Sequence, residues 1–324
     1  MLRMLIGAIA LSTALVTHAL AQGKDDSFPT KPVTLVVPFA PGGNDGEARI
    51  EAGKMSELLG QQFLIDYKPG AGSTIGTGYV AKAAPDGHTL LVASGPFPSL
   101  TALFKDLSFD PIKDFAPVSL MSKRTTVLLV HPAFPAKSFQ DYVAYARANP
   151  GKINFGTAGA GATVHLAGAW IHSATNTNAT FIHHKGTGPM LLELAAGRID
   201  VAPANLVVAT AQIKSGKVRV LAIMNDTRSP LLPGVMTIAE QGLPGYDYGS
   251  WLGFVAPGAT PVAIVNKLSE AFARVARMPD IVKRFEPEGA VMVGSTPAEF
   301  RKLLVAETER WNIVVRDNQI KLEQ

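Results

Sequence analysis

Short runs of Val, Leu and Ile alternate along the chain with longer segments in which apolar residues recur at helical spacing. The short runs are apolar almost without interruption, which is typical of strands that helices cover on both faces. We therefore expect an α/β fold built on mostly parallel sheets flanked by helices. The expected strands are Val33–Phe39, Phe63–Asp66, Thr89–Ser94, Thr126–Val130, Ile153–Phe155, Thr180–His183, Ile199–Ala202, Val218–Ile223 and Trp251–Val255.

Several of the helical segments carry their own start signals. Ser138 and Thr296 each precede a helical pattern and are followed three residues later by an acidic residue, as in a capping box. Pro297, directly after Thr296, suits the first turn of a helix. The expected helices are Glu47–Leu59, Ile75–Ala84, Phe139–Asn149, Val164–Ser173, Pro189–Ala196, Pro261–Ala276, Pro279–Phe285 and Pro297–Asp317.

Two segments are candidates for carrying the chain between domains, of which a chain of this length has room for two. Val118–Val130 leaves the first half of the chain, and Trp251–Val255 runs into Ala-Pro-Gly. Two crossings would build the first domain from both ends of the sequence and the second from its middle. We therefore expect residues 22–125 and 256–324 to form the first domain and residues 126–255 the second, with the C-terminal helices packed on the N-terminal sheet.

Composition narrows the function classes. Of the 324 residues, 47% are hydrophobic and 17% are charged, which indicates a packed globular protein rather than a disordered chain. The 30 basic and 26 acidic residues are scattered singly, without the basic runs of a nucleic-acid-binding surface. The sequence has no cysteine, which excludes disulfides, thiolate zinc sites, iron–sulfur clusters and cysteine nucleophiles. We expect no nucleic-acid partner and no cofactor.

The first residues have the features of a secretory signal peptide. Arg3 precedes the apolar run Leu5–Val16, and Ala19–Ala21 supplies the small residues that precede a cleavage site before Gln22. A membrane anchor is the alternative, but it needs about 20 apolar residues, and polar residues interrupt this run. We therefore expect residues 1–21 to be removed and the mature chain to be exported and soluble. An exported protein meets no pool of ATP or nicotinamide cofactor, which weakens any function that depends on one.

Two glycine-rich turns, Phe39–Asp45 and Thr157–Thr163, each join an expected strand to an expected helix. Ligands usually bind at this junction in open α/β sheets, because it lies at the carboxyl edge of the strands. Glycine lets backbone N–H groups approach a ligand, and the unsatisfied N–H groups at a helix start favour an anion. One turn on each domain, facing across a cleft, would hold a carboxylate from two sides. The alternative is that both are tight turns that only let a helix pack on its sheet.

Other motifs give weaker evidence of chemistry. Glycines within residues 69–76 have the spacing GxGxxxG, one residue longer than the dinucleotide fingerprint, so we interpret them as a structural turn. The sequence contains no HExxH, GxSxG or P-loop motif. We expect His172 to lie on a helix surface, Trp251 to line the cleft and Asp45 to cap a helix. An exported hydrolase of small esters that uses His165 or Asp45 is the alternative function, although no second catalytic group accompanies either residue in sequence.

A series of short motifs follows in order along nearly all of the mature chain: Val-Pro-Phe-Ala-Pro-Gly-Gly at 37–43, Lys-Pro-Gly-Ala-Gly at 68–72, Ala-Ala-Pro-Asp-Gly-His-Thr-Leu-Leu at 83–91, Asp-Pro-Ile-Lys-Asp-Phe-Ala-Pro-Val-Ser at 110–119, Ala-Asn-Pro-Gly-Lys-Ile-Asn-Phe-Gly at 148–156, His-Leu-Ala-Gly at 165–168 and Thr-Ile-Ala-Glu-Gln-Gly-Leu-Pro-Gly-Tyr at 237–246. As a set, they resemble the Bug-type extracytoplasmic solute receptors of tripartite tricarboxylate transporters. The resemblance implies a periplasmic binding protein fold of type II-like form, with two α/β domains joined by two crossing strands. It also implies a monomer that closes on a small organic carboxylate and delivers it to a membrane permease.

The resemblance also implies where the ligand binds. In this family the two glycine-rich turns bind carboxylate oxygens through backbone N–H groups, hydroxyls and ordered water. We expect no catalytic or metal-binding residues. The ligand-binding residues carried over to this chain are Phe39, Ala40, Pro41, Gly42, Gly43, Asn44, Asp45, Ser94, Thr157, Ala158, Gly159, Ala160, Gly161, Thr163, His165, His184, Lys185, Gly186, Ala204 and Asn205.

The chain departs from the family pattern at three places. The first turn is one residue shorter at Asn44–Glu47. Phe181–Gly186 reads Phe-Ile-His-His-Lys-Gly where members usually carry His-Val-Pro-Tyr-Lys-Gly, which makes His184 a new hydrogen-bond donor. Ala204 stands where an Asp is frequent, so a candidate partner for a ligand ammonium group is missing. We therefore expect a simple or aromatic carboxylate without an amine as the ligand. A receptor that presents its loaded form to a sensor kinase is a further alternative.

Overall fold

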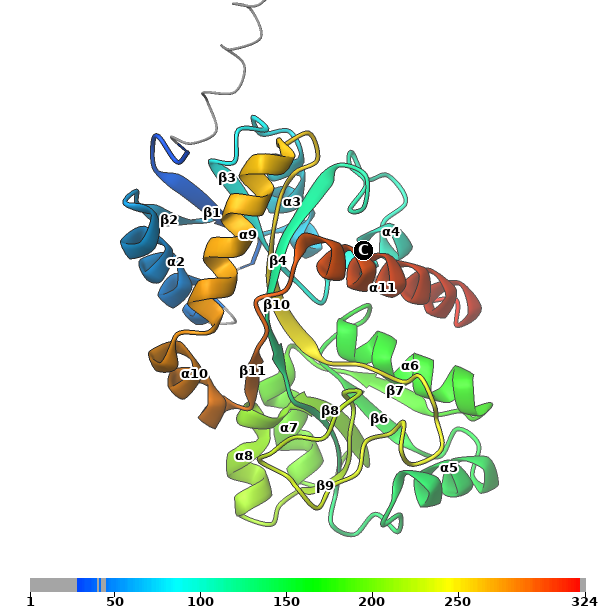
Figure 1. The fold of residues 1–324 in the computed structure, drawn as a ribbon. Coiled ribbons are helices and arrows are strands. Elements are labelled where there is room, and N and C mark those ends of the chain that lie inside the picture. The colour runs from blue at the N-terminus through cyan, green and yellow to red at the C-terminus, as the bar shows by residue number, and fades with distance from the viewer. Residues whose placement is uncertain (1–27, 40, 42–44, 321–324) are drawn as a thin grey trace, which may run out of the picture.

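The computed structural model describes residues 28–39, 41 and 45–320 (Figure 1). The predicted signal peptide lies outside this range, as do Ala40, Gly42, Gly43 and Asn44 of the first glycine-rich turn. Within the described ranges, no helix is both long and apolar enough to cross a membrane.

The first sheet has the order β11-β4-β10-β3-β1-β2. Strand β1 pairs in parallel with β2 and β3, whereas β10 pairs antiparallel with β3 and β4, and β11 antiparallel with β4. The sheet is therefore mixed, and its antiparallel part consists of β11 and of β4 and β10, the two strands that connect to the other sheet. The strand bounds are β1 Val33–Val37, β2 Phe63–Tyr67, β3 Thr89–Ser94, β4 Phe115–Arg124, β10 Ser250–Pro257 and β11 Ala290–Met292.

The second sheet has the order β7-β6-β8-β5-β9. Strand β6 pairs in parallel with β7 and β8, while β5 pairs antiparallel with β8 and β9. The predicted α/β fold is confirmed, with each sheet mixed where a connecting strand enters it. The strand bounds are β5 Thr126–Val130, β6 Asn154–Thr157, β7 Thr180–His183, β8 Val201–Asn205 and β9 Arg219–Ile223.

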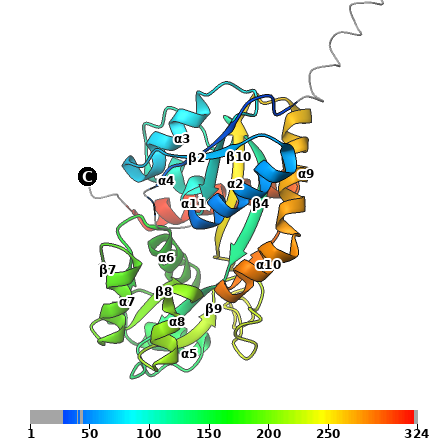
Figure 2. The ribbon, with the colours of Figure 1, turned by 90° about the vertical axis from the view of Figure 1, so that its left-hand side faces the viewer.

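Helices cover both faces of each sheet, as the nearly continuous apolar strands predict (Figures 1 and 2). The predicted capping boxes at Ser138 and Thr296 are both present. The helix bounds are α2 Asp45–Leu59, α3 Thr74–Ala81, α4 Leu100–Leu103, α5 Phe139–Ala148, α6 Thr163–Thr175, α7 Thr187–Ala195, α8 Leu206–Lys214, α9 Val262–Ala276, α10 Pro279–Phe285 and α11 Pro297–Asp317, with 3₁₀ turns at Ala71–Ser73, Phe97–Ser99 and Glu286–Glu288.

The two sheets and their helices form two lobes, one above the other (Figure 2). We call the part built on the first sheet lobe 1 and the part built on the second sheet lobe 2. Strand β4 continues into β5 with only Thr125 between them, so one extended segment serves both sheets. The return passes from the end of β9 at Ile223 to the start of β10 at Ser250. Both connections meet at one level, because Ser250 pairs with Arg124. We call this level the junction.

Helix α11 touches both lobes. Phe300 and Leu304, from its first half, are buried against lobe 1, whereas Trp311, Val314 and Val315 belong to the buried cluster of lobe 2. The C-terminal helix therefore packs on the N-terminal sheet, as the sequence predicts, and also reaches the second lobe. In Figure 1, its red ribbon runs between the two lobes, directly above α6.

Candidate functional site

The carboxyl ends of the parallel strands in lobe 1 lie at the junction. Strand β10 starts there at Ser250, and two residues later Leu252 pairs with Ser94, the last residue of β3. Because β1 runs parallel to β3, its end at Val37 lies on the same edge. The first glycine-rich turn leaves the sheet from this edge.

The carboxyl ends of the parallel strands in lobe 2 face the same level. Strand β5 starts at Thr126, which pairs with Asn205, the last residue of β8. Strands β6 and β7 run parallel to β8, so their last residues, Thr157 and His183, end at this edge. The parallel edges of the two sheets therefore face each other across the junction, which is the arrangement that ligand-binding α/β domains use.

The two lobes meet at Thr163, the first residue of α6. A β-carbon placed on Gly95, which follows β3 in lobe 1, would lie 3.6 Å from Cγ2 of Thr163. The side chain of Thr163 also hydrogen-bonds to Tyr248, from the segment that returns to lobe 1. The second glycine-rich turn therefore reaches lobe 1 at the loop that follows Ser94.

Two glycines give the second turn its shape. Gly159 and Gly161 have φ values of 140° and 71°, in a region that side chains with a β-carbon rarely adopt. The amide of Ala162 closes the turn by donating to the carbonyl of Gly159 at 3.2 Å. Helix α6 then starts without a side-chain cap at Ala162, so its first N–H groups face the turn. This geometry favours an anion at the turn.

His165 holds the turn against α6 as a neutral hydrogen-bond acceptor. Its Nδ1 accepts the amide hydrogen of Gly161 at 3.0 Å, which leaves the ring proton on Nε2. Burial, followed by the neighbouring His183, lowers the pKa of His165 to about 4. The side chain is 7% exposed and its ring lies 4.8 Å from that of His183. One amide of the turn is therefore bound internally, and the imidazole carries no charge at neutral pH.

The residues after β7 support the same turn from the side. The amide of His184 donates to the carbonyl of Thr157 at 3.0 Å, and the His184 Nδ1 lies 3.2 Å from that carbonyl. The amide of Gly186 donates to the carbonyl of Ala158 at 3.2 Å. Lys185 between them is exposed. The structure therefore brings the predicted residues 184–186 together with the predicted turn.

The described part of the first turn lies beside a small recess, lined by residues that include Pro38, Phe39 and Ser94. Asp45 is the first residue of α2 and is 4% exposed. Its Oδ2 accepts hydrogen bonds from Tyr67 Oη at 2.7 Å and from Arg49 Nη2 at 2.8 Å. Asp45 is thus helical rather than a cap before the helix, and its carboxylate ties α2 to β2.

Ala204 is buried in the core of lobe 2. Asn205 lies at the junction, where its Oδ1 is 3.2 Å from the Thr126 hydroxyl. Two other residues stand differently from their sequence interpretation. The prediction of a surface His172 is wrong, because it is buried and bonded to Tyr142 and Thr177. Trp251 is buried in lobe 1 instead of lining the cleft, since strand β10 turns it toward α11.

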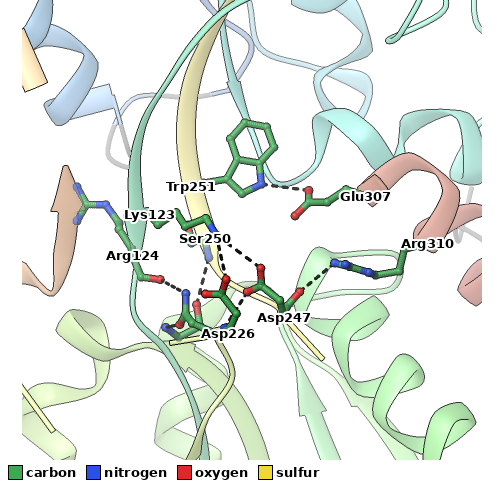
Figure 3. Close-up of polar contacts among 10 residues, drawn as sticks. Lys123, Arg124, Asp226, Asp247, Ser250, Trp251, Glu307 and Arg310 are labelled. Atoms are coloured by element: carbon green, nitrogen blue, oxygen red, sulfur yellow. Dashed lines mark hydrogen bonds and ion pairs between the residues drawn. The ribbon is translucent and has the colours of Figure 1, made fainter. Parts of the chain in front are cut away.

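The junction carries a polar network that no sequence motif indicates (Figure 3). Asn225 binds both sides of the crossing: its Oδ1 accepts from the amide of Thr126 at 2.8 Å and its Nδ2 donates to the carbonyl of Arg124 at 3.1 Å. The Lys123 ammonium lies 3.7 Å from Asp226 and 3.6 Å from Asp247. These contacts join the outgoing and returning segments at the level where the lobes meet.

A buried ion pair connects the junction to the helix after the first turn. Arg124, the last residue of β4, donates through Nη2 to Glu47 of α2 at 2.5 Å and through Nη1 to Glu288 at 3.1 Å. The Arg124 and Glu47 side chains are 8% and 0% exposed. Charges buried this deeply persist only when paired, so the contact fixes α2 to the crossing strand. No local sequence pattern predicts this pair, because its members are 77 positions apart in the sequence.

The described residues contain no group of three or more His, Asp or Glu side chains placed to hold a metal ion. What they offer at the junction is backbone N–H groups, hydroxyls and imidazoles around an anion-favouring turn. This set suits the binding of a small anion.

Comparison with known proteins matches almost the whole chain. The family model for the tripartite tricarboxylate transporter family receptor matches residues 47–320. Protein BugT of Bordetella pertussis is 32% identical over 301 residues, covering 92% of this chain and 92% of BugT. The structure of Rpa4515 from R. palustris with adipate is similar with a TM-score of 0.75 and 33% identity, covering 91% of this chain and 100% of that one. MatC from Rhodopseudomonas palustris with bound malate is similar with a TM-score of 0.72 and 35% identity, covering 89% and 100%.

Proposed function

Since the chain belongs to the Bug-type receptors of the tripartite tricarboxylate transporter family, we propose that it captures a small carboxylate between its lobes in the periplasm and delivers it to a membrane permease. The family and its solved members are solute-binding receptors rather than enzymes, which removes the hydrolase alternative. The two similar structures that hold adipate and malate support a carboxylate as the ligand class. Export through cleavage near Ala21–Gln22 is part of the proposal.

The observation that carries the proposal is the meeting of two strand edges at one anion-favouring turn. The carboxyl ends of β1, β3, β6 and β7 all lie at the junction, and Gly95 of lobe 1 approaches Thr163 of lobe 2. A ligand carboxylate beside the turn Thr157–Thr163 would receive hydrogen bonds from the first N–H groups of α6. Its remaining atoms would face Phe39, Ser94 and the first glycine-rich turn.

We further propose that the ligand has no ammonium group. This proposal rests on the family resemblance, because an Asp that could pair with an ammonium group is frequent where this chain has Ala204, which is buried in lobe 2. A ligand panel that includes an amino acid tests it separately. Affinity should be micromolar or tighter, which corresponds to about −8 kcal/mol. The receptor should hold the ligand unchanged.

Native mass spectrometry of protein purified from its own host tests the function, because a trapped ligand reports its own mass. Calorimetry should then give one-to-one binding of a plain carboxylate from a panel of adipate, malate, benzoate and aspartate, with no turnover. Binding of aspartate alone would contradict the amine-free ligand. Binding of none of the panel, with no trapped acid, would contradict the function.

A further inference from the structure

Thr157, which opens the second glycine-rich turn, has a hydroxyl with three close polar neighbours. Its Oγ1 lies 2.6 Å from Nδ1 of His183, 3.3 Å from the carbonyl oxygen of Gly159 and 3.4 Å from the Gly159 amide nitrogen. The residue is fully buried, and its place is fixed by the parallel register that sets Thr157 opposite His183. The hydroxyl therefore stands between an imidazole and the turn proposed to bind the ligand.

A hydroxyl has only one proton to donate, so the state of His183 decides where that proton goes. When Nδ1 of His183 carries no proton, the 2.6 Å contact uses the Thr157 proton, and Oγ1 presents only lone pairs to the turn. When Nδ1 carries a proton, as in the charged ring or in the neutral Nδ1–H tautomer, the ring donates to Oγ1 and the hydroxyl proton is free to point into the turn. An anion held beside the ring favours the charged form over the neutral tautomer. A carboxylate accepts hydrogen bonds and donates none, so it favours the second state.

The position of His183 exposes its ring to solvent and places it beside the turn proposed to bind the anion. The side chain is exposed at the end of β7. Histidine is the side chain that exchanges a proton near neutral pH, and a nearby anion favours its charged form. The titratable groups around it are His165 on α6 and His184 and Lys185 on the segment that follows β7. His165, with a pKa lowered to about 4, is neutral and adds no repulsion to a second charge.

We propose that His183 is a positioning residue that couples capture of a carboxylate to uptake of a proton, by turning the Thr157 hydroxyl from an acceptor into a donor. This inference rests on the proposed function, because it acts on the same turn. It adds that the receptor binds its ligand more tightly in an acidic medium and takes up as much as one proton with each ligand. At full coupling, affinity changes about tenfold per pH unit.

Calorimetry of the full mature protein with adipate and malate tests this inference. Titrations at pH 7 in buffers of different ionisation enthalpy should show a net uptake of protons, up to one per ligand. Affinity measured from pH 5.5 to 8 should fall as the pH rises.

Two substitutions separate the coupling from simple loss of a contact. His183→Asn places an amide N–H near the position of Nδ1 that does not titrate, so it should keep high affinity and give a flat pH profile. His183→Ala should bind at least several-fold more weakly, also with a flat profile. His131→Asn, at the opposite end of β5 from the junction and beside Gly197, is the matched control and should keep the wild-type profile.

The outcomes distinguish this inference from the function on which it rests. A wild-type protein that binds adipate or malate with equal affinity at pH 5.5 and pH 8 and without proton uptake would overturn the coupling alone. His183→Asn with the wild-type pH slope would overturn it as well. A wild-type protein that binds no carboxylate at any pH would overturn both the function and the coupling.

Discussion

The indole Nε1 of Trp251 donates a hydrogen bond to Oε2 of Glu307 at 3.1 Å, and this bond joins the strand that leaves the junction to the middle of α11 (Figure 3). One turn later, Arg310 donates to the carbonyl of Asp247 at 2.9 Å and lies 4.3 Å from the ring centre of Trp170 in lobe 2. The bonds of α11 therefore fall on both sides of the junction. The helix forms a third link between lobes that two chain segments already join.

The buried carboxyl group of Glu307 should make stability depend on pH. Burial raises the pKa of Glu307 to about 7; Asp247 acts in the same direction, while Trp251, Arg310 and Lys123 oppose it. The folded protein therefore holds a proton that the unfolded chain has already lost at intermediate pH. Stability from this group is present at acidic pH and is lost as the pH rises from the ordinary glutamate pKa toward about 7.

Glu307→Gln removes this titration. Between pH 5 and pH 8, the free energy of unfolding should shift in favour of the variant by up to about 3 kcal/mol relative to wild type. Urea unfolding at the two pH values measures this shift. Glu309→Gln, on the exposed face of the same helix, is the control. A pH dependence unchanged by Glu307→Gln would show that this carboxyl group titrates normally.

Two glutamates one turn apart on α2 should respond oppositely to the same substitution. Glu47 pairs with the buried Arg124, whereas neither carboxylate oxygen of Glu51 has a hydrogen-bond partner in the described structure. Burial, then the charge of Glu47, raises the pKa of Glu51 well above its usual range, although Arg124 opposes the shift. Glu47 is therefore a buried charge with a partner, whereas burial favours the neutral form of Glu51.

Glu47→Gln should destabilise the fold by about 3 kcal/mol, because it leaves the Arg124 charge buried with Glu288 alone. Glu51→Gln should leave stability unchanged or raise it, since it replaces a neutral carboxyl group by a neutral amide. Thermal and urea unfolding of the two variants at pH 7 make the comparison. Equal losses for both would mean that Glu51 is charged in the native protein.

Gly76 on α3 supports the segment that leads into the first glycine-rich turn. A β-carbon at this position would lie 2.7 Å from the carbonyl oxygen of Lys68 and 2.9 Å from Cα of Pro38. Backbone atoms cannot give way as a flexible side chain does, so Gly76→Ala should cost about 1–3 kcal/mol and weaken ligand binding. Gly53→Ala on α2, where the same carbon meets nothing within 4 Å, should instead stabilise the helix by up to about 1 kcal/mol. Reversed effects would contradict the close packing at Gly76.

Ligand binding should close the lobes by rotation at the junction. The sequence predicts a hinge near Val118–Val130 and Trp251–Val255, and we place it at Thr125, between β4 and β5, and beside Ser250, where β10 begins. Small-angle scattering with a verified ligand should give a smaller radius of gyration than without it. Superimposable curves would argue against closure.

The sequence predicts those parts of the fold that depend on local patterns. Apolar runs locate the strands, and the capping residues Ser138 and Thr296 locate two helix starts. The sequence does not predict helix α8, because its opening residues Leu-Val-Val resemble a continuation of strand β8. The sequence also does not predict the short strand β11, since its three residues form a strand only through their pairing with β4.

The candidate site is predictable only in part for the same reason. The glycine-rich turn Thr157–Thr163 is a local motif and was expected. The contact of Thr157 with His183 needs the parallel register of β6 and β7, and the bond from Trp251 to Glu307 needs the path of α11. The members of such pairs are tens of residues apart, so no local spacing in the sequence predicts their contact.

A crystal structure of the mature protein grown with adipate tests the central claim most directly. We expect one carboxylate of adipate within hydrogen-bond distance of the turn Thr157–Thr163, and the rest of the molecule facing Ser94 and the end of β1. Adipate bound outside the junction, or a turn that contacts no anion while adipate binds in solution, would contradict the claim that the two strand edges form the receptor site.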